Sequence, residues 1–158
     1  MTSTLDLKKI NKTIKIFAAV QCALVALLVF MAVQFQVKLQ SIGRGSQFMT
    51  GVVVSFVVQL VLFYPIFRFA AKEANRDFSV IGRDLSKEET KAFIKQKRWA
   101  DVIKISVFGF FFIFFMALKA STPPVVMSVI YYSFILTILT YLQCYNFAIK
   151  RCKREQTN

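Results

Sequence analysis

Four long apolar blocks, separated by short polar segments, dominate this sequence. The first block, residues 16–37, contains 22 residues and no charged side chain. About 20 apolar residues in a helix are enough to cross the roughly 30 Å of hydrocarbon in a bilayer. We therefore expect an all-α integral membrane four-helix bundle, with residues 1–158 forming a single membrane domain. Its predicted spans are about 16–37, 48–71, 102–118 and 125–149.

The composition supports a membrane location. Hydrophobic residues make up 56% of the chain, and 18 residues are Phe. A soluble domain is usually closer to half apolar, even when Gly is counted. Outside the apolar blocks, the longest polar stretch is about thirty residues, in the segment 72–101. That length is too short to bury a hydrophobic core of its own.

Basic residues are distributed unevenly between the two ends of the predicted spans. Of the 21 Lys and Arg residues, 18 lie before the first span, in the central region 68–104 or after the fourth span. The other three lie in the links at the opposite ends: Lys38, Arg44 and Lys119. Because cytoplasmic loops carry an excess of Lys and Arg, we expect both ends of the sequence and the connection 72–101 to be cytoplasmic.

This topology also accounts for the net charge of +13 without a nucleic-acid partner. Basic residues next to membrane spans attract anionic lipid headgroups. We therefore expect the partners to be the bilayer with its anionic headgroups and either other membrane protein subunits or further copies of this chain.

The central connection contains a helix start signal. Ser86 and Glu89 have the spacing of a capping box, and no Pro or Gly interrupts the residues that follow up to Gly109. We expect the third helix to begin there and to have a cytoplasmic amphipathic extension, with Phe93, Trp99 and Ala100 away from its basic stripe. The stripe faces either solvent and lipid headgroups or an anionic partner, and it consists of Lys87, Lys91, Lys95 and Arg98.

Residues typical of enzymes and metal sites are scarce. The chain has no His, and its three Cys residues lack the paired spacing of a metal site. We therefore expect no metal, no cofactor, no small-molecule substrate and no catalytic activity. Asp101 and Lys104 lie three residues apart where the third span begins, which predicts an interfacial ion pair.

Neutral polar residues occur within the predicted spans, whereas no ionisable residue lies in the middle of one. This argues against an ion-coupled pump but leaves a passive pore possible. The polar residues could form a shared cavity or partner-facing seam, or they could make hydrogen bonds between helices. The seam would consist of Gln21, Gln59, Ser106 and Gln143.

The order of these features resembles the ATP synthase subunit I family of small four-span membrane proteins. The resemblance rests on Gln21 early in the first span, Gly51 opening the second, Asp101 to Lys104 entering the third, and a proline entering the fourth. The third span of the family typically starts Gly-Glu-x-x-Lys, and the matching residues here are Ala100, Asp101 and Lys104. The resemblance implies an assembly factor for the rotary ATPase ring in the bacterial inner membrane.

Three functions fit these observations. We expect a non-enzymatic accessory, assembly or structural subunit of a larger membrane complex. One alternative is a homo-oligomeric pore or holin-like channel, in which the polar seam lines the lumen. Another is a membrane sensor or effector that is triggered through its basic connection.

Overall fold

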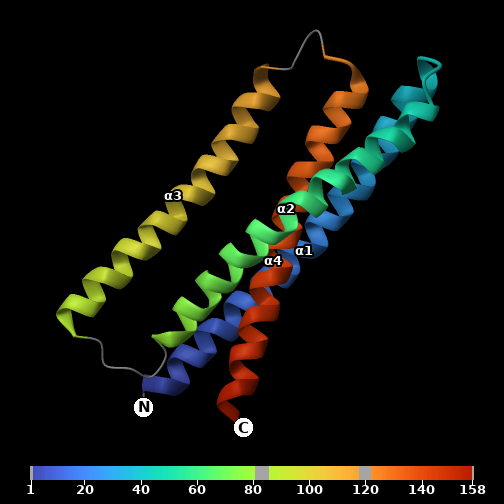
Figure 1. The fold of residues 1–158 in the computed structure, drawn as a ribbon. Helices are drawn as coiled ribbons and strands as arrows, with labels where there is room; N and C mark the ends of the chain where they lie inside the picture. Colours follow the sequence, from blue (N-terminus) through green and yellow to red (C-terminus); the bar gives the residue numbers. More distant parts are fainter. Residues whose placement is uncertain (1, 81–85, 118–121, 158) are drawn as a thin grey trace.

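Four helices form the fold in a computed structural model, which describes residues 2–80, 86–117 and 122–157. No strand occurs within these ranges. Figure 1 shows α1, α2 and α4 gathered together, with α3 beside them. The first residues of α1 and α3 and the last residues of α2 and α4 lie at one end of the molecule. The helices are α1 (Thr2–Ser41), α2 (Ser46–Ser79), α3 (Lys87–Ala117) and α4 (Pro124–Thr157).

A tight turn built on Gly43 joins α1 to α2. Gly43 has a φ of 71°, the left-handed conformation that glycine adopts at low cost. Its amide donates to the Gln40 carbonyl at 3.0 Å, and the Arg44 amide donates to the Leu39 carbonyl at 2.8 Å. These two bonds define a Schellman motif, which caps the carbonyl end of α1.

The helices are longer than the apolar blocks that predicted them. α2 continues eight residues beyond the predicted end of its span, and α4 continues from 149 to Thr157 through a basic segment. The predicted connection 72–101 therefore consists largely of helix, because residues 72–79 complete α2 and residues 87–101 begin α3. Residues 81–85 of that connection, and Leu118 at the end of the predicted third span, lie outside the described residues.

The most extensive helix pair is α2 with α4. Contacts between them advance in the same direction along both helices, from Ser55 with Val129 to Asp77 with Tyr145, so the two helices are parallel. Small side chains line the seam and allow close approach of the backbones. Ala70 and Ala74 are fully buried there, against a cluster on α4 that consists of Cys144, Tyr145, Ala148 and Ile149.

The other two helices flank this pair. α1 runs antiparallel to α4, with Phe35 against Tyr132 toward one end and Phe17 against Tyr145 toward the other. α3 meets α4 through the rings of Phe108 and Phe111, whose centroids lie 5.5 and 4.7 Å from that of Phe134.

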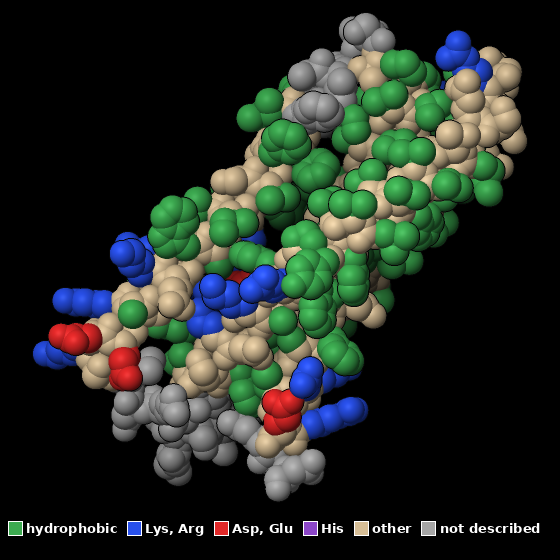
Figure 2. Space-filling view, in the orientation of Figure 1, with side chains coloured by type: hydrophobic (Ala, Val, Ile, Leu, Met, Phe, Trp, Pro, Cys, Tyr) green, Lys and Arg blue, Asp and Glu red, His purple; other side chains and the backbone are tan. Residues whose placement is uncertain are grey.

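Much of the surface is apolar. Within the described residues, α1, α2 and α4 are long and apolar enough to cross a membrane. Figure 2 shows hydrophobic side chains covering most of the length of the molecule, whereas Asp, Glu and most of the visible Lys and Arg lie in the half that holds both termini, and a smaller basic group lies at the opposite tip. Soluble monomers rarely expose continuous apolar surfaces of this extent. The surface is therefore suited to lipid.

Candidate functional site

A buried carboxylate joins α2, α3 and α4 near the charged end of the molecule. Glu73 of α2 is only 6% exposed. The Tyr141 hydroxyl, on α4, donates to Glu73 Oε2 at 2.6 Å. Lys104 Nζ, on α3, donates to Glu73 Oε1 and also lies over the Tyr141 ring. One carboxylate thus connects three helices, and we call Glu73, Arg76, Asp77, Lys104, Tyr141 and Tyr145 the Glu73 cluster.

A second carboxylate repeats this arrangement one turn further along α2. Asp77 Oδ2 accepts a hydrogen bond from the Tyr145 hydroxyl at 2.9 Å. Glu73 and Asp77 are four residues apart, as are Tyr141 and Tyr145, and residues at this spacing share a helix face. Because α2 and α4 are parallel, the two acids meet the two tyrosines in matching order.

Arg76 completes the cluster and extends it to α3. Its Nη2 atom lies 3.5 Å from Glu73 Oε1 and 3.3 Å from Asp77 Oδ1. Its Nη1 atom donates to the carbonyl of Gln96 on α3 at 3.0 Å, and its guanidinium lies over the Phe93 ring. Arg76 and Lys104 therefore each link α2 to α3 through a polar contact.

The two acids of the cluster are balanced by two bases. A carboxylate removed from water is costly unless cations and hydrogen-bond donors surround it. Here Glu73 has a lysine, an arginine and a tyrosine hydroxyl as partners, and Asp77 has an arginine and a tyrosine. The arrangement is suited to fixing helix positions.

The predicted pair Asp101 and Lys104 is present, but it is secondary. The two groups lie 3.5 Å apart, and the Asp101 side chain is 51% exposed. Lys104 Nζ makes its shorter contact with Glu73. The sequence therefore identified the cation correctly and missed its main partner.

The four residues of the predicted polar seam are not brought together. Gln21 Nε2 on α1 donates to Gln143 Oε1 on α4 at 3.2 Å. Separately, Gln59 Nε2 on α2 donates to Thr140 Oγ1 on α4 at 2.6 Å. Ser106 lies on α3 and is exposed. Gln59 Oε1 also accepts from Thr137 Oγ1 at 3.4 Å. The three glutamines thus make hydrogen bonds between helices, whereas a lining role between copies of the chain stays a prediction.

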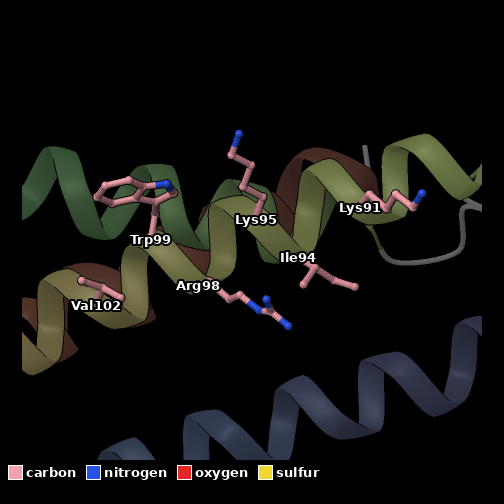
Figure 3. Close-up of a pocket in the computed structure, with 6 residues that line it drawn as sticks. All are labelled: Lys91, Ile94, Lys95, Arg98, Trp99 and Val102. Carbon is pink, nitrogen blue, oxygen red and sulfur yellow. The ribbon is translucent and has the colours of Figure 1, made fainter.

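The basic stripe shares its face of α3 with apolar residues. Lys91, Lys95 and Arg98 line an open hollow of about 540 Å³ together with Ile94, Trp99 and Val102. We call these six residues the strip. Figure 3 shows Lys95 and Trp99 extending to one side of the strip and Ile94 and Arg98 to the other. The expectation that Trp99 lies away from the stripe is wrong, because one turn of helix places it next to Lys95.

The remaining two residues expected away from the stripe do lie on the opposite face. Ala100 is buried, and Phe93 lies under the guanidinium of Arg76. Lys87, the first stripe residue, is exposed in the first turn of α3.

Sequence reasoning missed Glu73 and Asp77 because it assigned both to a polar connection. A signal for them was present. Two acids four residues apart follow the second apolar block, and two tyrosines four residues apart lie near the end of the fourth. Matching polar pairs at the same ends of two parallel spans are candidates for a shared buried layer.

Comparisons of this chain with protein-family models, with curated proteins and with solved structures find no match. The class of protein therefore follows from its own residues. It is a helical protein in which, among the described residues, three helices are long and apolar enough to cross a membrane.

Proposed function

We propose that this chain is a non-enzymatic integral membrane protein, with both termini cytoplasmic, that serves as an accessory, assembly or structural subunit of a larger membrane complex. The second half of α3 is the third of its four spans, and the first half of α3 is the cytoplasmic amphipathic extension. The membrane is the bacterial inner membrane. The observation that carries this proposal is the exposed apolar surface of α3.

Few contacts within the described residues attach α3 to the other helices. Lys104 and Arg76 tie the helix to α2, yet beyond Lys104 large apolar side chains remain uncovered. Ile105 is 71% exposed, Phe112 66% and Ile113 70%. Lipid covers part of this surface, and we propose that a helix of a partner subunit covers the rest.

The Glu73 cluster supports a structural role. Its carboxylates are engaged with cations and tyrosine hydroxyls that hold three helices together. A catalytic site would instead leave an activated nucleophile or base facing a substrate.

The test is affinity purification from membranes in mild detergent, followed by native mass spectrometry. We expect foreign subunits in fixed stoichiometry. A closed ring of this chain alone would contradict the proposal and favour the pore. A current through reconstituted protein that changes in Gln59→Leu or Gln143→Leu variants would do the same.

Matched variants locate the partner surface. The double variant Phe112→Ala/Ile113→Ala on α3 should lower the yield of foreign subunits, because its side chains form the proposed contact. Val29→Ala/Phe30→Ala on α1 removes side chains of similar exposure, 58% and 57%, and should leave the yield unchanged. Equal yields from the two double variants would contradict a contact through α3.

The resemblance to ATP synthase subunit I names one complex to test first. We propose the ring of the rotary ATPase as the partner, with Asp101 and Lys104 as the residues to change. The Asp101→Asn variant should reduce copurification of ring subunits while preserving the fold, since the Asp101 side chain is exposed and does not belong to the Glu73 cluster. Copurification of a different complex would remove the rotary ATPase from the proposal and leave the accessory role in place.

A further inference from the structure

The strip on α3 faces away from the helices that anchor α3. Phe93, Ala100 and Lys104 all contact or face the rest of the bundle, and a helix of 3.6 residues per turn places them roughly opposite Lys91, Lys95 and Arg98. The apolar members of the strip are correspondingly exposed, with Ile94 at 44%, Val102 at 52% and Trp99 at 63%. The strip is therefore a free outer surface in this chain.

The cations of the strip are available for a ligand. Within the described part of the chain, no ion pair is made by Lys91, Lys95 or Arg98. Three cations within two helical turns attract an anion whose charges are spread over a surface. Arg98 adds a planar fork of donors that suits phosphate.

The height of the strip along the molecule matches a headgroup layer. Trp side chains favour the membrane interface, where each polar layer is about 5–8 Å thick. With a rise of 1.5 Å per residue, Arg98 lies about 1.5 Å and Lys95 about 6 Å from the level of Trp99 along the helix. Lys91 lies about 12 Å away, and its flexible side chain can reach back toward the interface.

The mixture of residues favours lipid over a soluble anionic protein. Ile94, Trp99 and Val102 lie among the cations and continue toward the exposed apolar residues of α3, such as Ile105. Bases alternating with aromatic and aliphatic residues are typical of helices that lie against lipid headgroups. A site for a soluble acidic segment would not need to be continuous with the surface facing the hydrocarbon.

We propose that Lys91, Lys95, Arg98 and Trp99 form a binding strip for the headgroup phosphates of anionic phospholipids. The inference rests on the proposed membrane placement, and it is independent of the accessory role. Lipid bound to the outer face of α3 fixes the position of the helix along the membrane normal, while the Glu73 cluster fixes its opposite face against the other helices.

The test uses the full chain in neutral detergent and native mass spectrometry during titration with phosphatidylglycerol or phosphatidylcholine of the same acyl chains. The wild type should bind phosphatidylglycerol at least about tenfold more tightly, since each base near an anionic headgroup contributes to affinity. The triple variant Lys91→Gln/Lys95→Gln/Arg98→Gln should lose at least about tenfold of that affinity and keep its affinity for phosphatidylcholine.

A control with the same charge change isolates the strip. Lys12, Lys15 and Lys72 are exposed bases on α1 and α2. The variant Lys12→Gln/Lys15→Gln/Lys72→Gln should retain most of the preference for phosphatidylglycerol. An equal loss in the two triple variants would overturn the proposal, because it would reduce the effect to net charge.

A second measurement needs no variant, because Trp99 is the single Trp of the chain. Its fluorescence should be quenched more by phosphatidylglycerol carrying a spin label near the headgroup than by equally labelled phosphatidylcholine. Equal quenching would overturn the proposal, as would displacement of the lipid by inorganic phosphate or by polyglutamate. If the protein shows no lipid preference but still binds foreign subunits, only the lipid-binding proposal is contradicted. If the protein prefers phosphatidylglycerol but forms a closed ring of this chain alone, only the accessory role is contradicted.

Discussion

At the scale of single residues, Glu73 stands out as a buried charged side chain. It is a buried carboxylate whose partners come from its own helix, from α3 and from α4. Such a group stabilises the fold only while its partners are present, because removing one side of a buried pair leaves an unpaired charge in a poorly solvated place.

Replacing Glu73 with Ala should therefore lower the free energy of unfolding by about 3 kcal/mol, since Lys104 and Tyr141 both lose their acceptor. The measurement is unfolding in mixed micelles, followed by far-ultraviolet circular dichroism. The control is Glu155→Ala, which removes an ion pair whose side chains are 72% and 62% exposed, and which should cost less than about 1 kcal/mol. Equal effects of the two variants would contradict the buried cluster.

Gly51 lies so close to α4 that an added Cβ atom would disturb the packing. A Cβ atom on Gly51 would lie 2.8 Å from the Oγ atom of Ser128, on the facing side of α4. The variant Gly51→Ala should destabilise the fold by about 1–3 kcal/mol, because extra volume in a close-packed seam forces the two helices apart. Thermal unfolding in detergent measures the change.

Two further variants test whether the close approach of Gly51 to Ser128 causes the destabilisation. Gly109 of α3 has open space around it, with nothing within 4 Å of an added Cβ atom. Gly109→Ala should thus be neutral or stabilising by up to about 1 kcal/mol. Adding Ser128→Ala to Gly51→Ala should restore part of the lost stability, and a failure to do so would contradict the close approach at Ser128.

At the scale of elements, the beginning of α3 follows directly from its sequence. The Glu89 amide donates to Ser86 Oγ at 3.2 Å, while the Ser86 amide donates to Glu89 Oε2 at 2.9 Å. This is the predicted capping box, and it is confirmed.

Ser86→Ala should speed amide hydrogen exchange at residues 87–90 about fivefold, because a lost cap costs about 1 kcal/mol of local helix stability. Ser46→Ala at the start of α2 is the control, since no side-chain hydrogen bond caps that helix. Its exchange should not change. Unaltered exchange in Ser86→Ala would mean that packing alone determines where α3 begins.

The ends of the helices were less predictable than their centres. The length of an apolar block indicates how much hydrocarbon a helix can cross, but it does not indicate where the helix ends. α2 therefore continues through Lys72, Glu73 and Arg76, which are good helix formers, and ends at Ser79. The burial of Glu73 follows from this continuation, which the hydropathy pattern could not show.

At the scale of the whole molecule, the arrangement of neighbours was the least predictable feature. Helices joined by short links are expected to pack side by side, yet the most extensive pair is α2 with α4, which are not consecutive. The pairing of α2 with α4 follows from small residues at matching positions along the two helices, such as Gly51 against Ser128 and Ala74 in the cluster with Ala148. These pairs become apparent only once the two helices are placed in parallel.

We propose that the chain crosses the membrane four times, with α3 as one of the crossings. Single-cysteine variants in sealed inverted and right-side-out membrane vesicles, labelled with an impermeant maleimide, test it directly. The background replaces the three native cysteines. We expect Arg44→Cys and Thr122→Cys to be labelled only from outside, and Lys97→Cys and Glu155→Cys only from the cytoplasmic side. Labelling of Thr122→Cys from the same side as Lys97→Cys would show that α3 does not cross, and it would contradict the four-span topology.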